Sequence, residues 1–262
     1  MASNLSTIGF VFENVDAFRA AMLACANGIG LRAPCPNGSY GIWKSRTGAE
    51  VWFHLSQSHD GNTEIYGLTP YFEGNSDAKV RIIAAISQDG DNDFEGAFHA
   101  WVNPNDADSG SYPIVFEAVD FATQAGAEWP AIRVVRLVAF AKDVQAFESE
   151  AAYAIHQNAN SGDTKFRMAS KSLIATGLFA AAMSSENPDS REPPSADALL
   201  SGVVIEHRML TNEATGRDFA WLLLETLDFN LEVIADPEIV NGAIVDGGVV
   251  EVTATLFGRF ID

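Results

Sequence analysis

Short runs rich in β-branched and aromatic residues recur along this chain of 262 residues, and clusters of Gly, Asn, Asp and Ser separate them. Such runs are typical of β-strands, and the polar clusters between them are typical of turns. The pattern therefore predicts a β meander in the first half of the chain. The runs that predict its strands are residues 6–12, 40–44, 50–56, 64–72, 80–86, 96–102 and 112–116.

A helix is predicted directly after the first run. Asn14 or Asp16 can cap its N-terminus and Gly28 can end it. Its apolar residues recur at helical spacing at Val15, Phe18, Met22 and Cys25. The N-terminal part thus reads as a strand and a helix followed by three or more strands, a mixed sheet with a βαβββ-type order.

A weak internal repeat is visible between residues 1–130 and 131–183. Residues 132–140 read as another strand, followed by a predicted helix that starts at Asp143 and ends near Asn158. Residues 144–147 (Val-Gln-Ala-Phe) match residues 15–18 (Val-Asp-Ala-Phe). Duplication is one interpretation of this match. The other is that the Val-x-Ala-Phe pattern is what a helix packed on a sheet often needs.

Residues 184–198 predict a linker, because they combine three prolines with Ser, Asn, Asp and Glu. Beyond it, residues 203–206, 219–225, 231–235 and 249–256 read as short strands at near-regular spacing, which predicts a small closed barrel of the OB type. We therefore expect an α+β protein with three segments. These are a sheet domain in residues 1–183, a linker in residues 184–198 and an OB-like β-barrel in residues 199–262.

The charge is strongly negative, at −19 from 35 acidic and 16 basic residues. Binding a phosphate backbone requires a positive stripe, and only residues 131–183 hold more bases than acids. Nucleic acids and anionic membranes are therefore not expected as partners.

The longest apolar run, around residues 175–183, is far shorter than the roughly 20 residues of a membrane span. Because no basic region precedes the first apolar stretch, we expect a cytoplasmic protein.

Several stretches resemble a bacterial family of uncharacterised proteins. They are residues 48–52 and 65–74 in the N-terminal part, and residues 212–219, 233–237, 247–250 and 256–259 in the C-terminal part. The resemblance implies two parts, an α+β part and an OB-like barrel, and brings no activity with it.

The βαβββ order is also similar to the modules of vicinal oxygen chelate proteins, which pair such units around a metal. That resemblance implies a metal ligand, His, Gln or Glu, on the first strand. Here the two faces of that run carry Ile8, Phe10 and Phe12 on one side and Gly9 and Val11 on the other.

One strand face mixes aromatic and ionisable residues, as a surface that lines a ligand site does. Along residues 50–55, the alternation of a strand puts Val51, Phe53 and Leu55 on one face and the other three residues on the opposite face. Residues 97–101 repeat this character. The predicted ligand-binding residues are Glu50, Trp52, His54, Tyr71, Glu73, His99 and Trp101.

Among these residues, Glu50, His54, Glu73 and His99 are the groups available for acid–base chemistry or metal binding. The alternative interpretation is a half-exposed sheet face without a chemical role. No cofactor is predicted. A divalent metal is the alternative.

An acidic turn provides a second set of possible metal ligands. Asp89, Asp91 and Asp93 alternate as Ca²⁺ ligands do. The segment departs from the EF-hand pattern, because Phe94 stands where that loop needs Gly and Ala100 where it needs Glu. An ordinary acidic turn is therefore the preferred interpretation.

The two cysteines, Cys25 and Cys35, fit no disulfide framework and no zinc motif, and we interpret them as packing residues.

The chain contains no P-loop, no Gly-x-Gly-x-x-Gly fingerprint, no Gly-x-Ser-x-Gly elbow and no His-Glu-x-x-His pair. The leading hypothesis is therefore a non-enzymatic binding or protein-interaction protein that associates with itself or with a protein partner. The alternative is a metal-dependent enzyme of the vicinal oxygen chelate kind. A third hypothesis is single-strand binding by the barrel through Phe219, Trp221 and Phe229, which the local net charge of −8 disfavours.

Overall fold

Most of the predicted strands are present in a computed structural model of the protein, which describes residues 3–57, 60–87, 92–105, 109–160, 167–183 and 193–261. The chain is α+β, with two sheets and three α-helices in the described ranges. The first sheet is antiparallel, in the order β1–β2–β3–β4. Its strands are β1 (Leu31–Cys35), β2 (Gly38–Lys44), β3 (Ala49–Gln57) and β4 (Thr63–Phe72).

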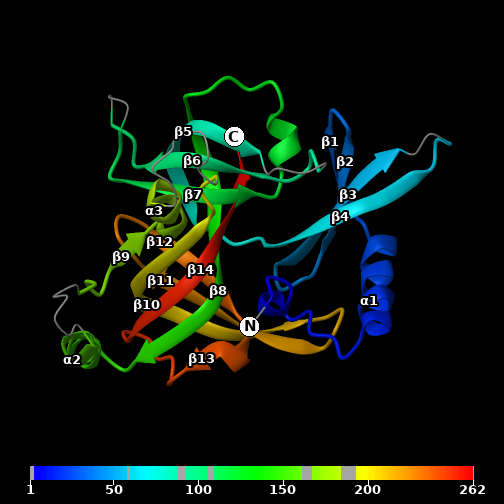
Figure 1. Cartoon of the computed structure of the whole chain (residues 1–262). Helices are drawn as coiled ribbons and strands as arrows, with labels where there is room; N and C mark the ends of the chain where they lie inside the picture. Colours follow the sequence, from blue (N-terminus) through cyan, green and yellow to red (C-terminus); the bar gives the residue numbers. More distant parts are fainter. Residues whose placement is uncertain are drawn as a thin grey trace.

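Helix α1 (Val15–Asn27) lies beside this sheet (Figure 1). The Asn14 side chain caps it and accepts a hydrogen bond from the Ala17 N–H at 2.9 Å. Met22 and Cys25 are the buried residues of the helix. The helix predicted from the apolar spacing is confirmed, and so is the packing role of Cys25.

Residues 6–12 do not form the predicted strand. The segment instead starts with a short 3₁₀ helix, η1 (Ser6–Ile8), which ends at Gly9 with a φ of 81°. The Asn212 side chain donates to the Ile8 carbonyl and the Thr215 hydroxyl donates to the Gly9 carbonyl, both at 2.7 Å. These side-chain bonds take the place of a strand ladder. The predicted βαβββ order is therefore not confirmed, because its first strand is missing.

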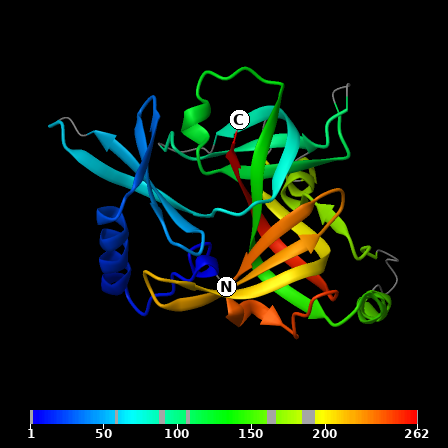
Figure 2. The ribbon, with the colours of Figure 1, turned by 180° about the vertical axis from the view of Figure 1, so that it is seen from behind.

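The second sheet closes into two five-stranded rings that share strands β8 and β14 (Figures 1 and 2). The first ring pairs β8 with β5, β5 with β6, β6 with β7, β7 with β14 and β14 with β8. Its strands are β5 (Asp77–Ser87), β6 (Gly96–Val102), β7 (Tyr112–Ala118), β8 (Ala131–Phe147) and β14 (Val249–Phe260).

The second ring joins the same β8 and β14 through three further strands. β14 pairs with β10, β10 with β11, β11 with β12, and β12 with β8. These strands are β10 (Asp197–Asn212), β11 (Arg217–Glu225) and β12 (Asn230–Ala235). Two short strands, β9 (Ser172–Ile174) and β13 (Val240–Asn241), extend the edges.

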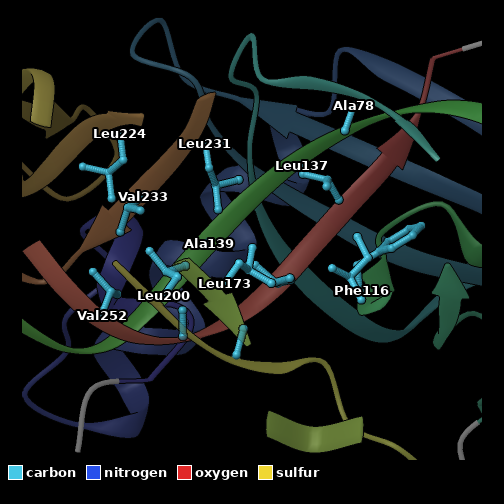
Figure 3. Close-up of a cluster of buried hydrophobic side chains, with 14 of the residues drawn as sticks. Ala78, Phe116, Leu137, Ala139, Leu173, Leu200, Leu224, Leu231, Val233 and Val252 are labelled. Carbon is cyan, nitrogen blue, oxygen red and sulfur yellow. The ribbon is translucent and has the colours of Figure 1, made fainter. Parts of the chain in front are cut away.

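One hydrophobic core runs through both rings. Figure 3 shows Leu137 and Ala139 of β8 beside side chains from β7, β10 and β12. The alternate residues of β8, Val138 and Phe140, belong to a second core that also includes side chains of the first sheet. β8 is therefore buried on both faces, which explains its nearly continuous apolar sequence.

A barrel made of residues 199–262 alone is not confirmed. β14 pairs with β8 from Val249↔Phe147 to Phe260↔Val135, and β8 lies before the predicted linker. The C-terminal strands therefore close a ring only with a strand from the N-terminal part. Pairing of this kind, between residues far apart in the sequence, leaves no local signal. Of the predicted linker, residues 184–192 lie outside the described ranges.

The predicted helix from Asp143 is also wrong at its start. Residues 144–147 continue β8, and α2 (Glu150–Asn160) begins only after them. The Val-x-Ala-Phe match with α1 therefore joins a strand to a helix, and the proposed repeat loses its common element. Strand pairing with β14 holds residues 143–147 extended.

The remaining helices are short. In the described part of the chain no helix is long and apolar enough to cross a bilayer. These helices are α3 (Thr176–Met183) and the 3₁₀ segments η2 (Phe121–Gln124) and η5 (Pro237–Ile239).

The shared strand predicts that the C-terminal segment does not fold alone. A polypeptide of residues 193–262 lacks β8, so β12 and β14 have no strand to close the ring. We expect its ¹H–¹⁵N spectrum to show the narrow amide dispersion of an unfolded chain, next to the wide dispersion of the full chain. A dispersed spectrum with cooperative thermal unfolding would show that the segment is an independent domain.

Candidate functional site

The structure brings five of the predicted residues to the junction between the first sheet and the rings. Glu50 and His54 of β3 face the rings, since Glu50 lies 3.8 Å from Arg259 of β14 and His54 stacks on Phe94. Trp52, Tyr71 and Glu73 join the same region through hydrogen bonds and ion pairs.

Two carboxylates and two cations form what we call the junction cluster, namely Glu50, Glu73, Lys44 and Arg259. The buried Glu50 carboxylate accepts a hydrogen bond from the Trp52 indole at 2.8 Å and lies 3.9 Å from the Lys44 ammonium. Arg259 donates to Glu73 at 2.9 Å, and Lys44 also pairs with Glu73. Burial raises the pKa of Glu50, and its hydrogen bond and the two cations oppose that rise. Glu50 and Glu73 therefore have a structural role: their ion pairs with Arg259 connect the first sheet to the second.

Tyr71 has a similar structural role. Its ring is fully buried, and its hydroxyl donates to the Arg136 carbonyl of β8 at 2.9 Å. The Arg136 side chain in turn donates to Asp77 at 2.7 Å. Burial raises the pKa of Tyr71. The phenol is therefore a fixed hydrogen-bond donor at the junction.

Glu232 of β12 is a buried carboxylate that the sequence analysis missed. It accepts hydrogen bonds from the backbone N–H groups of Asn75 and Ser76 at 2.5 and 3.1 Å, and from the Trp221 indole at 2.9 Å. A Cβ at Gly74 would lie 1.8 Å from its carboxylate oxygen. Glu232 thus fixes the connection between β4 and β5, and Gly74 is required for its close approach.

His54 is a neutral side chain in this environment. It is fully buried, and burial lowers its pKa to about 4. Its Nε2 lies 3.1 Å from the Thr69 hydroxyl, and its ring stacks on Phe94 with a centroid distance of 5.2 Å. Its Nδ1 lies 3.6 Å from Glu95.

A small cavity of about 190 Å³ lies next to His54, between β4 and the rings. Glu95, Glu117 and Thr69 line it. Burial, and secondarily the charge of Glu95, raise the pKa of Glu117 to about 7. A carboxyl group with this pKa suits acid–base chemistry. The cavity is nevertheless smaller than the roughly 300 to 1,000 Å³ of ligand pockets, so it has no room for a substrate of ordinary size.

His99 and Trp101 lie in the other sheet, on β6 between β5 and β7. Burial lowers the pKa of His99, and its buried Nε2 has no hydrogen-bond partner among the residues described. The structure does not bring these two residues into the junction cluster.

The predicted acidic turn is described only in part. Asp89 and Asp91 lie outside the described residues, whereas Asp93 is exposed and lines a larger cavity. Within the described ranges, no three His, Cys, Asp or Glu side chains are grouped so that they could hold a metal ion.

A second cavity, which we call the aromatic cavity, has a volume of about 490 Å³. It lies where the turn between β1 and β2 approaches η2 and the first ring, and both ribbon views show η2 between these two parts (Figures 1 and 2). The side chains that line it are mostly apolar. They are Pro36, Asn37, Ala85, Asp93, Phe98, Phe121, Ala122, Gln124, Ala125, Gly126, Ala127 and Trp129.

Three aromatic rings form the apolar wall of this cavity. The ring of Phe98 lies 5.2 Å from that of Trp129 and 5.4 Å from that of Phe121, measured between centroids. No local pattern in the sequence links these three residues, since each lies in a different segment. The available signal was Phe98, which alternates with His99 on β6, and the Trp-Pro pair at residues 129–130.

Tyr40 fixes the position of the cavity floor. Its buried hydroxyl donates to the Phe94 carbonyl at 2.6 Å and accepts a hydrogen bond from the Ala122 N–H at 2.9 Å. The Asn37 amide donates to Asp93 at 2.6 Å and joins the β1–β2 turn to the segment before β6. These bonds span the first sheet and the first ring, so the cavity depends on the way the two parts pack.

Asp120 is a buried carboxyl group just before η2. One oxygen accepts a hydrogen bond from the Phe260 N–H at 3.1 Å, and the other has no partner in the described part of the chain. Burial raises the pKa of Asp120 to about 7, against an ordinary value of 3.8. The Asp120 carboxyl group therefore binds its proton more tightly in the native state than in the unfolded chain.

The junction cluster predicts a large cost for removing its arginine. Arg259→Met leaves the buried Glu50 carboxylate with one cation fewer, and we expect a loss of about 3 kcal/mol in the free energy of unfolding, measured by urea denaturation. Arg46→Met removes a surface partner of Glu213 and is expected to cost less than about 1 kcal/mol. Equal, small effects of both substitutions would contradict a structural role for the cluster.

The raised pKa of Asp120 predicts a pH dependence of stability. Its contribution is complete below about pH 4 and is lost as the pH rises through 7. Asp120→Asn cannot ionise, so its free energy of unfolding relative to the wild type should rise by roughly 2 kcal/mol from pH 5 to pH 8. His54, whose pKa is lowered to about 4, makes the native state more stable as the pH rises from about 4 to 6.5. This contribution is the same in the wild type and in Asp120→Asn, so it cancels in the difference between their free energies of unfolding.

Asp16→Asn is the matched control for this measurement, because the Asp16 side chain is 95% exposed. The difference in free energy of unfolding between Asp16→Asn and the wild type should be the same at pH 5 and at pH 8. A difference between Asp120→Asn and the wild type that is independent of pH would show that Asp120 is ionised throughout.

No family model matches the sequence, and no curated protein or solved structure matches the chain. Function therefore has to be inferred from the geometry and chemistry of the cavities.

Proposed function

We propose that the protein binds a small apolar molecule in the aromatic cavity, without chemical conversion. The observation that supports this most strongly is the combination of an aromatic wall with few polar groups in a space of about 490 Å³. Ligand pockets commonly have volumes of about 300 to 1,000 Å³ and are lined in this way. They also occur preferentially at interfaces between parts of a fold and at the mouths of barrels.

The cavity walls are held in place before any ligand arrives. Phe98 and Ala122 are almost fully buried, and Tyr40 ties η2 to the first sheet. A preformed wall lowers the ordering cost of binding, because few side chains have to lose rotational freedom. This favours binding of a rigid apolar molecule such as a fused aromatic ring.

The chemistry of the lining favours binding over catalysis. Asp93 is the single ionisable side chain among the described residues that line the cavity. Acid–base or nucleophilic catalysis ordinarily needs a reactive group with a partner that activates or orients it. The Asn37 amide beside Asp93 does not ionise at neutral pH. It can therefore orient the carboxylate by a hydrogen bond but cannot act as its acid or base partner.

The contacts of the junction residues do not favour the rival metal-dependent enzyme. That hypothesis relies on Glu50, His54, Glu73 and His99, and the two carboxylates among them already bind Lys44 and Arg259.

Single-strand binding is disfavoured by burial as well as by charge. Phe219 is fully buried, and the Trp221 indole donates to Glu232. A fully buried ring is not available for stacking on a base.

Filling the cavity tests the proposal. Ala85 lines it from an exposed position of β5, opposite Phe98, so Ala85→Trp fills part of its volume without changing the core. With 2-naphthylmethanol as a neutral probe, we expect calorimetry to give at least tenfold weaker binding for this variant than for the wild type. Binding weakens because the indole at position 85 occupies the space in which the probe would contact the aromatic wall.

Ala84→Trp is the matched control, because Ala84 is also exposed and pairs with His99 on the opposite strand face. It should bind the probe as the wild type does. The proposal fails if the wild type does not bind the probe, or if both variants bind it with wild-type affinity.

A further inference from the structure

The charge of the cavity lining has one sign. Among the described residues that line the aromatic cavity, Asp93 is the sole charged side chain, and none of them is Lys, Arg or His. The other polar side chains are the amides of Asn37 and Gln124. The lining can therefore attract a positive group and offers no charge to a negative one.

Asp93 is placed to meet a ligand at the rim. It is exposed, and one of its oxygens accepts the hydrogen bond from the Asn37 amide at 2.6 Å. That bond orients the carboxylate toward the β1–β2 turn. A carboxylate has two oxygens with about four lone-pair sites, so it can accept hydrogen bonds from a ligand in addition to the one from Asn37.

The apolar wall also favours a positive group. The faces of aromatic rings carry negative partial charge and attract cations within about 6 Å. The Arg133 guanidinium already lies 5.6 Å from the centroid of the Trp129 ring, although Arg133 does not itself line the cavity. Phe98 and Phe121 have no such cation among the contacts of the described residues.

The surroundings strengthen the same preference. The chain has a net charge of −19. The Glu95 carboxyl group also lies close enough to Tyr40 for its negative charge to act on the Tyr40 hydroxyl. A cation at the rim gains from this potential, and an anion is repelled by it.

We infer that the ligand of the aromatic cavity is a cationic apolar amine, with its ammonium group on Asp93 and its apolar body against the wall formed by Phe98, Phe121 and Trp129. This inference rests on the proposed function, because it names the class of molecule that the same cavity takes. The amine donates hydrogen bonds to the carboxylate at the rim, where one end of the ligand stays in contact with water.

Three probes with the same ring system test the inference: 2-naphthylmethylamine, 2-naphthylmethanol and 2-naphthoate. At low salt and pH 7, we expect calorimetry to show the amine binding about fivefold more tightly than the alcohol, and the carboxylate most weakly. Raising the ionic strength should weaken binding of the amine and leave the alcohol unchanged. The Asp93→Asn variant should bind the amine only as tightly as it binds the alcohol.

Asp16→Asn controls for the overall charge of the protein. It removes the same charge from α1, a helix that contributes no residue to the cavity, and should keep the preference for the amine. Equal affinity of the wild type for the amine and the alcohol would overturn the inference and leave the proposed function intact. Loss of the preference in Asp16→Asn as much as in Asp93→Asn would overturn it too. Failure of all three probes to bind would overturn the proposed function itself.

Discussion

Strands β8 and β14 pair from Val249↔Phe147 to Phe260↔Val135, and this long ladder holds the second sheet together. Both strands belong to both rings, so every other strand of the second sheet is placed relative to them. The two faces of β8 separate the two main cores, with Leu137 in one and Val138 in the other. A polar residue on either face would lie in an apolar environment, which restricts the sequence of this strand more than that of any single-sided strand.

The first sheet is attached to this framework through the hydrophobic core that it shares with β8, and through buried charges and hydrogen bonds. Arg259 comes from β14 and meets Glu50 and Glu73 of the first sheet, while Glu232 of β12 holds the connection to β5. Buried charges of this kind require their partners, and so they fix one orientation of the two parts. The aromatic cavity lies in that same junction, which links its shape to the strand pairing.

The sequence predicted local structure better than it predicted pairing. Periods of two and of 3.6 identified β3 and α1, because these patterns are properties of consecutive residues. The prediction of a strand at residues 6–12 is wrong, since side chains more than 200 positions away satisfy the Ile8 and Gly9 carbonyls. The prediction of a helix at residues 144–147 is wrong because pairing with β14 keeps them extended.

The candidate site shows the same division. Glu50, Trp52 and His54 were placed together correctly, as neighbours on one strand face. The ion pair that connects Glu50 to the second sheet is made with Arg259, which is far away in the sequence and could not be predicted from the strand pattern. Phe98, Phe121 and Trp129 were not selected, because they become neighbours only when the first ring closes.

The most direct test of the central claim, that the aromatic cavity is the binding site, is a ¹H–¹⁵N spectrum of the tryptophan indoles. The chain has five tryptophans, and a Trp129→Phe variant assigns the signal of Trp129. On addition of 2-naphthylmethylamine, we expect the Trp129 signal to shift and saturate while those of Trp43 and Trp101 stay in place. A spectrum in which Trp129 does not move, or in which Trp221 moves instead, would contradict this claim.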